Sequence, residues 1–581
     1  MGPRKIAEHF ARNYKSLFNN VTNGHKLDYI RDNISRGAAS DCQSLVSKID
    51  SKLIDTALKK MKSGKRDAIF DVTSDCYLNG PVSLKLHLAN LIKIFISHGS
   101  VPHCVLLCTL IPLVKNSLGD ITSSNNYRAI AGGCLLLKLL DIVILLLEGD
   151  KLKFSELQFA YQSMTSTVTC SWTASAVIDY FNRNGSSVFA AAMDMSKAFD
   201  MVEWTSLFST LIKRKVSFCI LRLMLFIYEN QRCNVKWSGE LSSCFYVSNG
   251  VRQGAVSSAI LFGVYIDELL EILQRSRIGC YIDGIFFGAV IFADDILLLS
   301  ATRDGLQSLV KMFQKFASQK NLKFGTDTNP LRSKTKCIVF TKKRIDYANL
   351  APIVLDGKDL PWVKKVNHLG CILETNNSMK LDMLSKRGQF ISKVNSLLQE
   401  FHFVDPKIMI KFICTYATNF YGSSLWNLYS RDCEKLYSSW NVAVRNALKL
   451  DRRTHRHLVA PLSGQPHLKN MLLSRFAKFH KSLLNSPKFS VRFLARLLVG
   501  DRRTVFGRTL DRLKIECNTA DIHDLNAKQV KDKVVFVSPP ENGKSVGALA
   551  CELLELRDCK LQIDGFSHDE IDQMLSYVCT S

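Results

Sequence analysis

The stretch that decides the fold of this 581-residue chain is Ile291-Phe292-Ala293-Asp294-Asp295-Ile296-Leu297-Leu298. Two adjacent carboxylates stand between two short apolar runs of the kind that form strands. A two-residue Asp-Asp connection fits a tight hairpin, because Asp tolerates turn geometry better than most residues. Burying two acids at a hairpin tip is costly unless they bind cations. The pair therefore predicts either an exposed turn or, with a third carboxylate nearby, a Mg²⁺ site.

The third carboxylate is Asp194, which ends a nearly continuous apolar run over residues 187–193. Such a run is typical of a buried strand that delivers an acid to a site. Three acids on neighbouring strand ends can hold two divalent ions about 3.5–4 Å apart. We therefore predict Asp194, Asp294 and Asp295 as catalytic residues and metal ligands. Taken alone, Asp295 fits a turn-forming role equally well.

The charge balance indicates a polyanionic partner. The chain carries 77 Lys and Arg against 52 Asp and Glu, a net charge of +25. This excess predicts nucleic acid first and an anionic membrane second. The longest apolar stretch, residues 134–147, is too short to span a bilayer, and no signal peptide opens the chain. The 18 Cys lack zinc-ligand spacing, so we expect reduced thiols, no disulfide partner, and a nuclear or cytoplasmic protein that is neither secreted nor in a membrane.

Hydrophobic periodicity outlines the order of elements along the chain. A helix is expected at the N-terminus, followed by a polar, mixed segment over residues 20–80. Apolar spacing and end signals predict helices over 82–98, 205–230, 259–276 and 304–320, with a strand over 337–341. Beyond about residue 375 the pattern is mostly helical.

A basic block follows in the helical region. Residues 451–514 hold 15 Lys and Arg against three Asp. A solvated helix face explains any single charged run, but this density is at least as typical of a nucleic-acid surface. Arg452, Arg453 and Arg456 are the predicted nucleic-acid contacts.

Three motifs, in order, resemble those of a known family. The segment Asp194-Met195-Ser196-Lys197-Ala198-Phe199-Asp200 resembles D-x-S-K-A-F-D, residues 250–254 resemble G-V-R-Q-G, and residues 292–295 resemble Y/F-x-D-D. Together they resemble reverse transcriptases of non-LTR (LINE-type) retrotransposons over roughly residues 80–515. The resemblance implies an α+β right-hand polymerase: fingers, a palm whose antiparallel sheet carries the catalytic Asp residues, a helical thumb, and a mostly helical C-terminal region.

The resemblance also implies boundaries along the chain. An N-terminal helical extension (1–80) precedes the fingers and palm (81–375). A helical thumb (376–450), a basic nucleic-acid-binding region (451–515) and a C-terminal region of unknown role (516–581) follow.

Roles for substrate-binding residues are implied by the same motifs. Phe199 would lie under the sugar of the incoming nucleotide and exclude a 2′-hydroxyl, although a core aromatic is the alternative. Arg128 and Lys115 offer donors to the triphosphate, as a fork and a point charge; Lys115 fits a surface cation equally well. Gln253 and Gly254 would form the floor beneath the template base pair.

A lysine after the hairpin is the implied general acid for the leaving pyrophosphate. The resemblance favours Lys334 or Lys336 without choosing between them, and either could be a surface lysine. The implied cofactor is two Mg²⁺ ions, with Mn²⁺ as an alternative.

The implied function is RNA-directed DNA synthesis, in which a DNA primer on an RNA template is extended with deoxynucleoside triphosphates. Departures from the family pattern at Ala129, Gln162, Ser257 and Ala259 weaken the template and fingers surfaces but remove no metal ligand, so the activity of this copy stays open. The alternatives are a catalytically silent RNA-binding relic, a maturase-like protein, which Arg252 disfavours, and a reading frame without a selected product.

No nuclease motif accompanies the polymerase motifs. Fewer than about 100 residues precede the first fingers motif, which is short for a complete nuclease domain when typical domain lengths are considered. The sequence therefore predicts a truncated or repurposed element that extends a primer without making its own nick.

Overall fold

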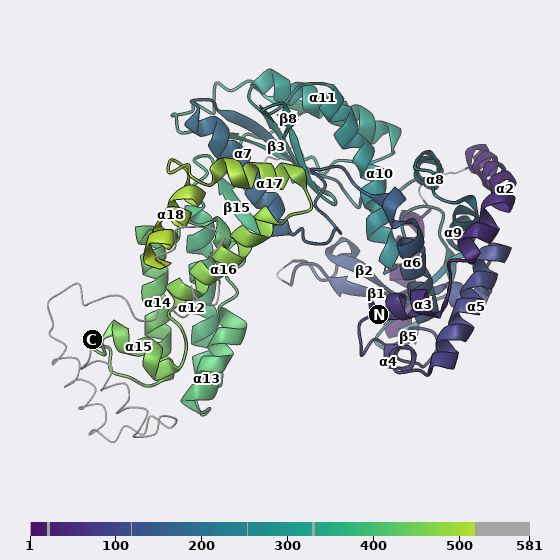
Figure 1. The fold of residues 1–581 in the computed structure, drawn as a ribbon, viewed down its shortest axis with the longest axis horizontal. Coiled ribbons are helices and arrows are strands. Elements are labelled where there is room, and N and C mark those ends of the chain that lie inside the picture. Colours follow the sequence, from purple (N-terminus) through teal and green to yellow (C-terminus); the bar gives the residue numbers. More distant parts are fainter. Residues whose placement is uncertain (1, 20–23, 118, 253, 328–331, 518–581) are drawn as a thin grey trace.

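The computed structural model describes residues 2–19, 24–117, 119–252, 254–327 and 332–517. In Figure 1 the chain forms an arch. A four-stranded sheet lies at its centre, an N-terminal lobe lies on one side, and a stack of C-terminal helices lies on the other. Within the described residues, no helix has both the length and the apolar character needed to cross a membrane.

The central sheet has the strand order β11-β3-β10-β9, and all its pairs are antiparallel. Its strands are β3 (Val188–Asp194), β9 (Ala289–Phe292), β10 (Asp295–Ser300) and β11 (Lys336–Phe340). Helices α7 (Thr167–Arg183) and α11 (Arg303–Gln319) pack against it. Every residue of β10 after Asp295 is buried, which explains why this strand is apolar throughout rather than alternating.

A second, five-stranded sheet forms the core of the N-terminal lobe. Its order is β2-β1-β4-β5, with β6 also pairing with β4. The strands are β1 (Leu107–Val114), β2 (Tyr127–Gly132), β4 (Arg232–Trp237), β5 (Glu240–Leu241) and β6 (Phe245–Tyr246). Helix α1 (Pro3–Leu17) packs on β4 through a separate core that includes Phe10 and Tyr14.

The predicted helices are confirmed in part. The helix over 82–98 is α5 (Val82–His98), which ends at Gly99 in a left-handed conformation. The segment 205–230 is helical as predicted but divided: α8 (Trp204–Lys213) and α9 (Phe218–Asn230) are separated at Lys215, whose φ is +59°. The mixed segment 20–80 also contains helices, of which α2 (Gly24–Val46) packs along α9. The lobe's other helices are α3 (Ser51–Leu58), α4 (Ser74–Leu78), α6 (Leu135–Glu148) and α10 (Val256–Arg275).

The described chain beyond residue 375 is helical, as predicted. Its helices are α12 (Lys380–Glu400), α13 (Pro406–Phe412), α14 (Arg431–Ala447), α15 (Arg456–Ser463), α16 (Leu468–Leu484), α17 (Phe489–Leu498) and α18 (Val505–Cys517). Helix α17 returns to pack on α7, and Arg183 of α7 forms an ion pair with Asp501. Nearly all of the C-terminal region predicted over 516–581 lies outside the described residues.

Candidate active site

The predicted hairpin is present, but its loop is shifted by one residue. Phe292 pairs with Asp295, so the two-residue loop is Ala293-Asp294 and Asp295 is the first residue of β10. Ala293, not an Asp, has the positive φ (+57°). That conformation costs an Ala side chain about 1 kcal/mol. The N–H of Ala293 donates to Oε1 of the buried Gln158 (3.3 Å), which helps hold the strained turn.

Sheet register brings the three acids to one edge. Asp295 of β10 lies directly opposite Asp194 of β3, and Asp294 occupies the hairpin tip beside them. Directly opposed residues on antiparallel strands have Cβ atoms about 4.5–5.5 Å apart. The sequence separation of 100 residues between Asp194 and Asp294 is therefore closed by one strand pairing.

The carboxylate of Asp194 lies under a glycine. Its Oδ2 atom is buried and makes no hydrogen bond within the described part of the chain. The backbone N–H of Gly325 donates to the Asp194 carbonyl oxygen (2.9 Å), and a side chain at position 325 would overlap Oδ2. A side chain at position 325 would therefore force the Asp194 carboxylate to move.

The pKa values of Asp294 and Asp295 are both raised. Desolvation by the surrounding protein raises the pKa of Asp294. The negative charge of Asp194 raises this pKa further, whereas the positive charge of Arg128 lowers it. Desolvation, followed by the charges of Asp294 and Asp194, raises the pKa of Asp295 from 3.8 to about 6. Both residues still reach solvent. A group of acids that disfavours its own ionisation is a typical binding environment for a cation.

Predicted cationic residues gather beside the acids. Nζ of Lys334 lies 4.0 Å from Oδ2 of Asp194. Desolvation lowers the pKa of Lys115, and so do the neighbouring charges of Lys197, Arg128 and Lys334. Lys115 follows β1 and Arg128 lies on β2, so one strand pair positions both. Sequence reasoning assigned no role to Lys197, although it lies within the motif that begins at Asp194.

Phe199 is half-buried and packs face to face on Phe262 of α10, with ring centroids 4.2 Å apart. Its carbonyl oxygen accepts a hydrogen bond from Val251 (2.9 Å), which ties it to the Gly250–Gly254 turn. The ring therefore contributes to packing and also lies at the start of the loop that leaves Asp194.

The predicted floor residues are described in part. Gly254 has φ of +80°, and a side chain there would overlap the carbonyl oxygen of Ala131 in β2. Glycine is therefore required at position 254 because the backbone there approaches the backbone of β2 closely. Gln253 lies outside the described residues.

The predicted nucleic-acid contacts are not part of this site. Arg452, Arg453 and Arg456 are exposed around the start of α15, which Figure 1 places at the far end of the helical stack from β3.

The donors fit a hard divalent cation in type, because carboxylate oxygens are the ligands that Mg²⁺ prefers. The orphaned, buried Oδ2 of Asp194 and the raised pKa values of its neighbours agree with this. In the described residues, however, no three His, Cys, Asp or Glu side chains are already converged as a complete ligand group. Any ion would have to draw the carboxylates together.

Comparison with known proteins identifies the fold. The reverse transcriptase (RNA-dependent DNA polymerase) family matches residues 115–373. The Pol polyprotein of the type-2 retrotransposable element R2DM of Drosophila melanogaster is 24% identical over 339 residues, which cover 56% of this chain and 32% of that protein. The Pol polyprotein of the type-1 retrotransposable element R2 of Nasonia vitripennis is 28% identical over 188 residues, covering 32% of this chain and 18% of that protein.

A solved telomerase from Candida albicans, in complex with a fragment of telomeric RNA, aligns with a TM-score of 0.34 and 11% identity over 74% of this chain and 71% of that one. At that score the likeness carries no argument.

Residues 115–373 therefore form a reverse transcriptase domain within a mixed helix-and-sheet fold that has a helical C-terminal region. The chain is a relative of the Pol polyproteins of non-LTR retrotransposons. It spans a third or less of the length of the two relatives described above.

Proposed function

We propose that this chain extends a DNA primer on an RNA template with deoxynucleoside triphosphates. The observation that carries the proposal is the register of β3 and β10, which sets Asp194 opposite Asp295 with Asp294 at the adjoining tip. A metal-dependent polymerase site explains why three acids share one sheet edge although this raises the pKa values of Asp294 and Asp295.

Asp194 and Asp294 are the principal ligands of two Mg²⁺ ions in this proposal, and Asp295 assists. The bound ions would lower the pKa of the attacking hydroxyl and stabilise the leaving pyrophosphate. Lys115 and Arg128 bind the triphosphate: the charge of Arg128 acts on Asp294, and Lys115 lies near Arg128 and Lys334, which supports this role.

Lys334 is the better candidate for the general acid. Its Nζ approaches Asp194, whereas Lys336 lies inside β11 and pairs with Ala192, two residues before that acid. Phe199 is the sugar gate, and the stacked ring of Phe262 behind it supports a fixed position for the gate.

In polymerase terms, we assign the central sheet to the palm, the β1–β2 sheet to the fingers, α12–α14 to the thumb and 451–515 to a basic nucleic-acid-binding region. The silent RNA-binding alternative gains no support from the site, because all three acids are present.

A primer-extension assay tests the proposal. The purified protein is given poly(rA)/oligo(dT), dTTP and Mg²⁺, and we expect dTMP incorporation. RNA binding without incorporation would overturn the enzyme and leave the binding protein.

A further inference from the structure

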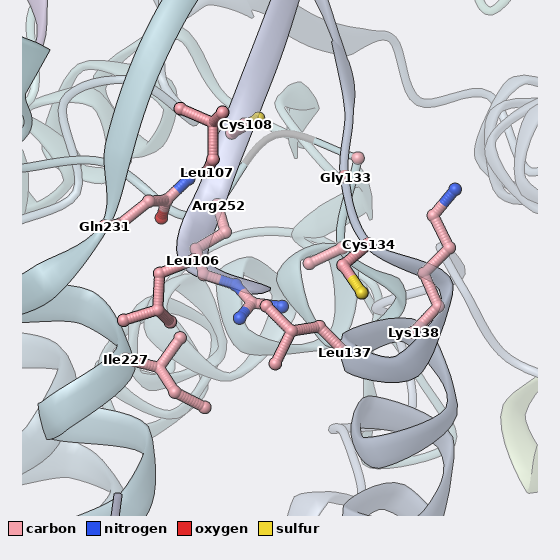
Figure 2. A pocket seen from close by; sticks show the side chains of 12 residues that line it. Leu106, Leu107, Cys108, Gly133, Cys134, Leu137, Lys138, Ile227, Gln231 and Arg252 are labelled. Atoms are coloured by element: carbon pink, nitrogen blue, oxygen red, sulfur yellow. The ribbon is translucent and has the colours of Figure 1, made fainter. Parts of the chain in front are cut away.

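The chain on either side of residue 253, Gly250–Arg252 and Gly254–Ala255, is anchored from inside the N-terminal lobe. The side chain of Arg252 leaves the turn and runs inward among Leu106, Leu137 and Ile227 (Figure 2). It ends on Asp141 of α6, where the guanidinium donates to Oδ2 (2.8 Å). Both side chains are more than 90% buried. A buried pair of this kind leaves an uncompensated charge if one partner is removed.

The same carboxylate also closes the N-terminus of α10. Asp141 Oδ2 accepts the backbone N–H of Val256 (3.2 Å), and Oδ1 accepts the hydroxyl of Ser257 (3.1 Å). The N-cap residue of α10 is Ala255, whose methyl group cannot accept a hydrogen bond. Asp141 therefore supplies from another helix the cap that the local sequence lacks, and its charge complements the helix dipole.

The remaining contacts show that the turn is held on several sides. Gly254 presses against the carbonyl oxygen of Ala131, and the hydroxyl of Ser258 donates to the carbonyl oxygen of Arg252. A displacement at Asp141 would therefore be transmitted to β2, which carries Arg128.

We infer that Asp141 is a positioning residue: through Arg252 and the N-terminus of α10 it fixes Gly254, which is predicted to form part of the floor beneath the template base pair. The assignment of that floor to a base pair rests on the proposed function. Ser257, which stands where the related family usually has Leu, acts here as part of the anchor rather than as a defect.

Helix α6 offers a matched control. Glu148 lies on the same helix and is as buried as Asp141, but it accepts hydrogen bonds from the N–H and hydroxyl of Ser217 at the start of α9 (3.2 and 2.6 Å). Glu148→Gln therefore neutralises a buried, helix-capping carboxylate of α6 without touching the turn.

Hydrogen exchange of the full chain is the first measurement. In Asp141→Asn the peptide spanning 254–262 should exchange about tenfold faster than in the unmutated protein, because capping groups protect the first turn of a helix. Glu148→Gln should leave that peptide unchanged and instead accelerate exchange around 217–221. Adding Ala255→Asp to Asp141→Asn supplies a local cap and should restore part of the protection.

The second measurement is the ratio of extension from a matched to a mismatched primer terminus. Asp141→Asn should lower this ratio by about tenfold, in line with the cost of small displacements at reacting centres; Glu148→Gln should not. Unchanged exchange in Asp141→Asn overturns the anchor, and faster exchange with an unchanged ratio overturns the positioning role. If the unmutated protein incorporates nothing, the proposed function fails, while exchange alone still decides the anchor.

Discussion

The acidic edge of the central sheet and the basic C-terminal helices use charge in opposite ways. At the sheet edge, Oδ2 of Asp194 lacks a hydrogen bond within the described residues, and crowding raises the pKa values of Asp294 and Asp295. In the basic block many cations already serve the fold. Arg475 donates to the Thr418 carbonyl oxygen, and Lys488, itself buried, donates to that of Ser155.

The contrast shows that charge density in a sequence is not the charge available to a ligand. The block over 451–514 has a net charge of +12 (15 minus 3), yet Arg492, Arg502 and Arg503 also contact groups of the protein. At the sheet edge, by contrast, Asp194 has a buried oxygen without a hydrogen bond in the described part of the chain, and the pKa values of Asp294 and Asp295 are raised. Unsatisfied, mutually repelling charge is the stronger indication of a site.

Among substitutions that leave the three acids themselves intact, the largest effect should come from covering Asp194. Gly325→Ala places a methyl group against Oδ2 of Asp194 and should lower incorporation by roughly 100-fold, since small displacements at a reacting centre have effects of this size. Gly388→Ala, in α12 with open space around it, is the control and should retain activity. Equal activity of both variants would show that Asp194 is not used as proposed.

A smaller change is expected at the sugar gate. Phe199→Ala should raise ribonucleotide relative to deoxynucleotide incorporation by roughly tenfold, a usual range for discrimination by one apolar group. Competition between dTTP and UTP measures it. Phe245→Leu, in the core of the β1–β2 sheet, should leave the ratio unchanged. If Phe199→Ala does not change the ratio of ribonucleotide to deoxynucleotide incorporation, Phe199 is not the sugar gate and only packs against Phe262.

The pH dependence of stability probes the acids directly. Folding raises the pKa of Asp295 from 3.8 to about 6, so the folded, metal-free protein holds that proton more tightly than the unfolded chain. The contribution of this proton to the free energy of unfolding is fully present below about pH 4 and is lost as pH rises through about 6. Mg²⁺ should therefore raise the unfolding temperature more at pH 7.5 than at pH 5. Asp295→Asn should reduce both the pH dependence of stability and the rise in unfolding temperature caused by Mg²⁺. A Mg²⁺ effect that is independent of pH would contradict this account.

The smallest effect should appear in the salt dependence of nucleic-acid binding. Replacing Arg452, Arg453 and Arg456 by Gln should reduce the slope of log K against log salt by up to about 0.9 for each phosphate that these side chains neutralise. Arg475→Gln is the matched control: it should lower the unfolding temperature without changing the slope, because its guanidinium serves the fold. Identical slopes in all three proteins would assign the block to a solvated, structural face.

Local pattern was enough to predict the strand ending at Asp194, the hairpin and the helix over 82–98. The loop register was mispredicted because turn preference points to Asp at the positive-φ position. Tertiary contacts instead place Ala293 there, with Gln158 bonded to it. Helix α2 was missed because its composition is polar and its contact with α9 is remote in sequence.

Contacts between distant segments could not be read from spacing at all. Asp141 lies within the apolar stretch 134–147, where spacing indicates no partner for it, yet it meets Arg252 more than 100 residues later. The overlap of Gly325 with Asp194 is likewise a consequence of how the chain folds back after α11.

Primer extension on an RNA template by the unmutated protein and by Asp194→Asn tests the central claim most directly. Asp283→Asn, which alters an exposed Asp in the turn between β7 (Tyr281–Ile282) and β8 (Ile285–Phe286), is the control. We predict Mg²⁺-dependent incorporation by the unmutated and Asp283→Asn proteins, and a loss of about 1,000-fold or more in Asp194→Asn, the scale expected when a metal-dependent step is disabled. Equal incorporation in Asp194→Asn would contradict the account.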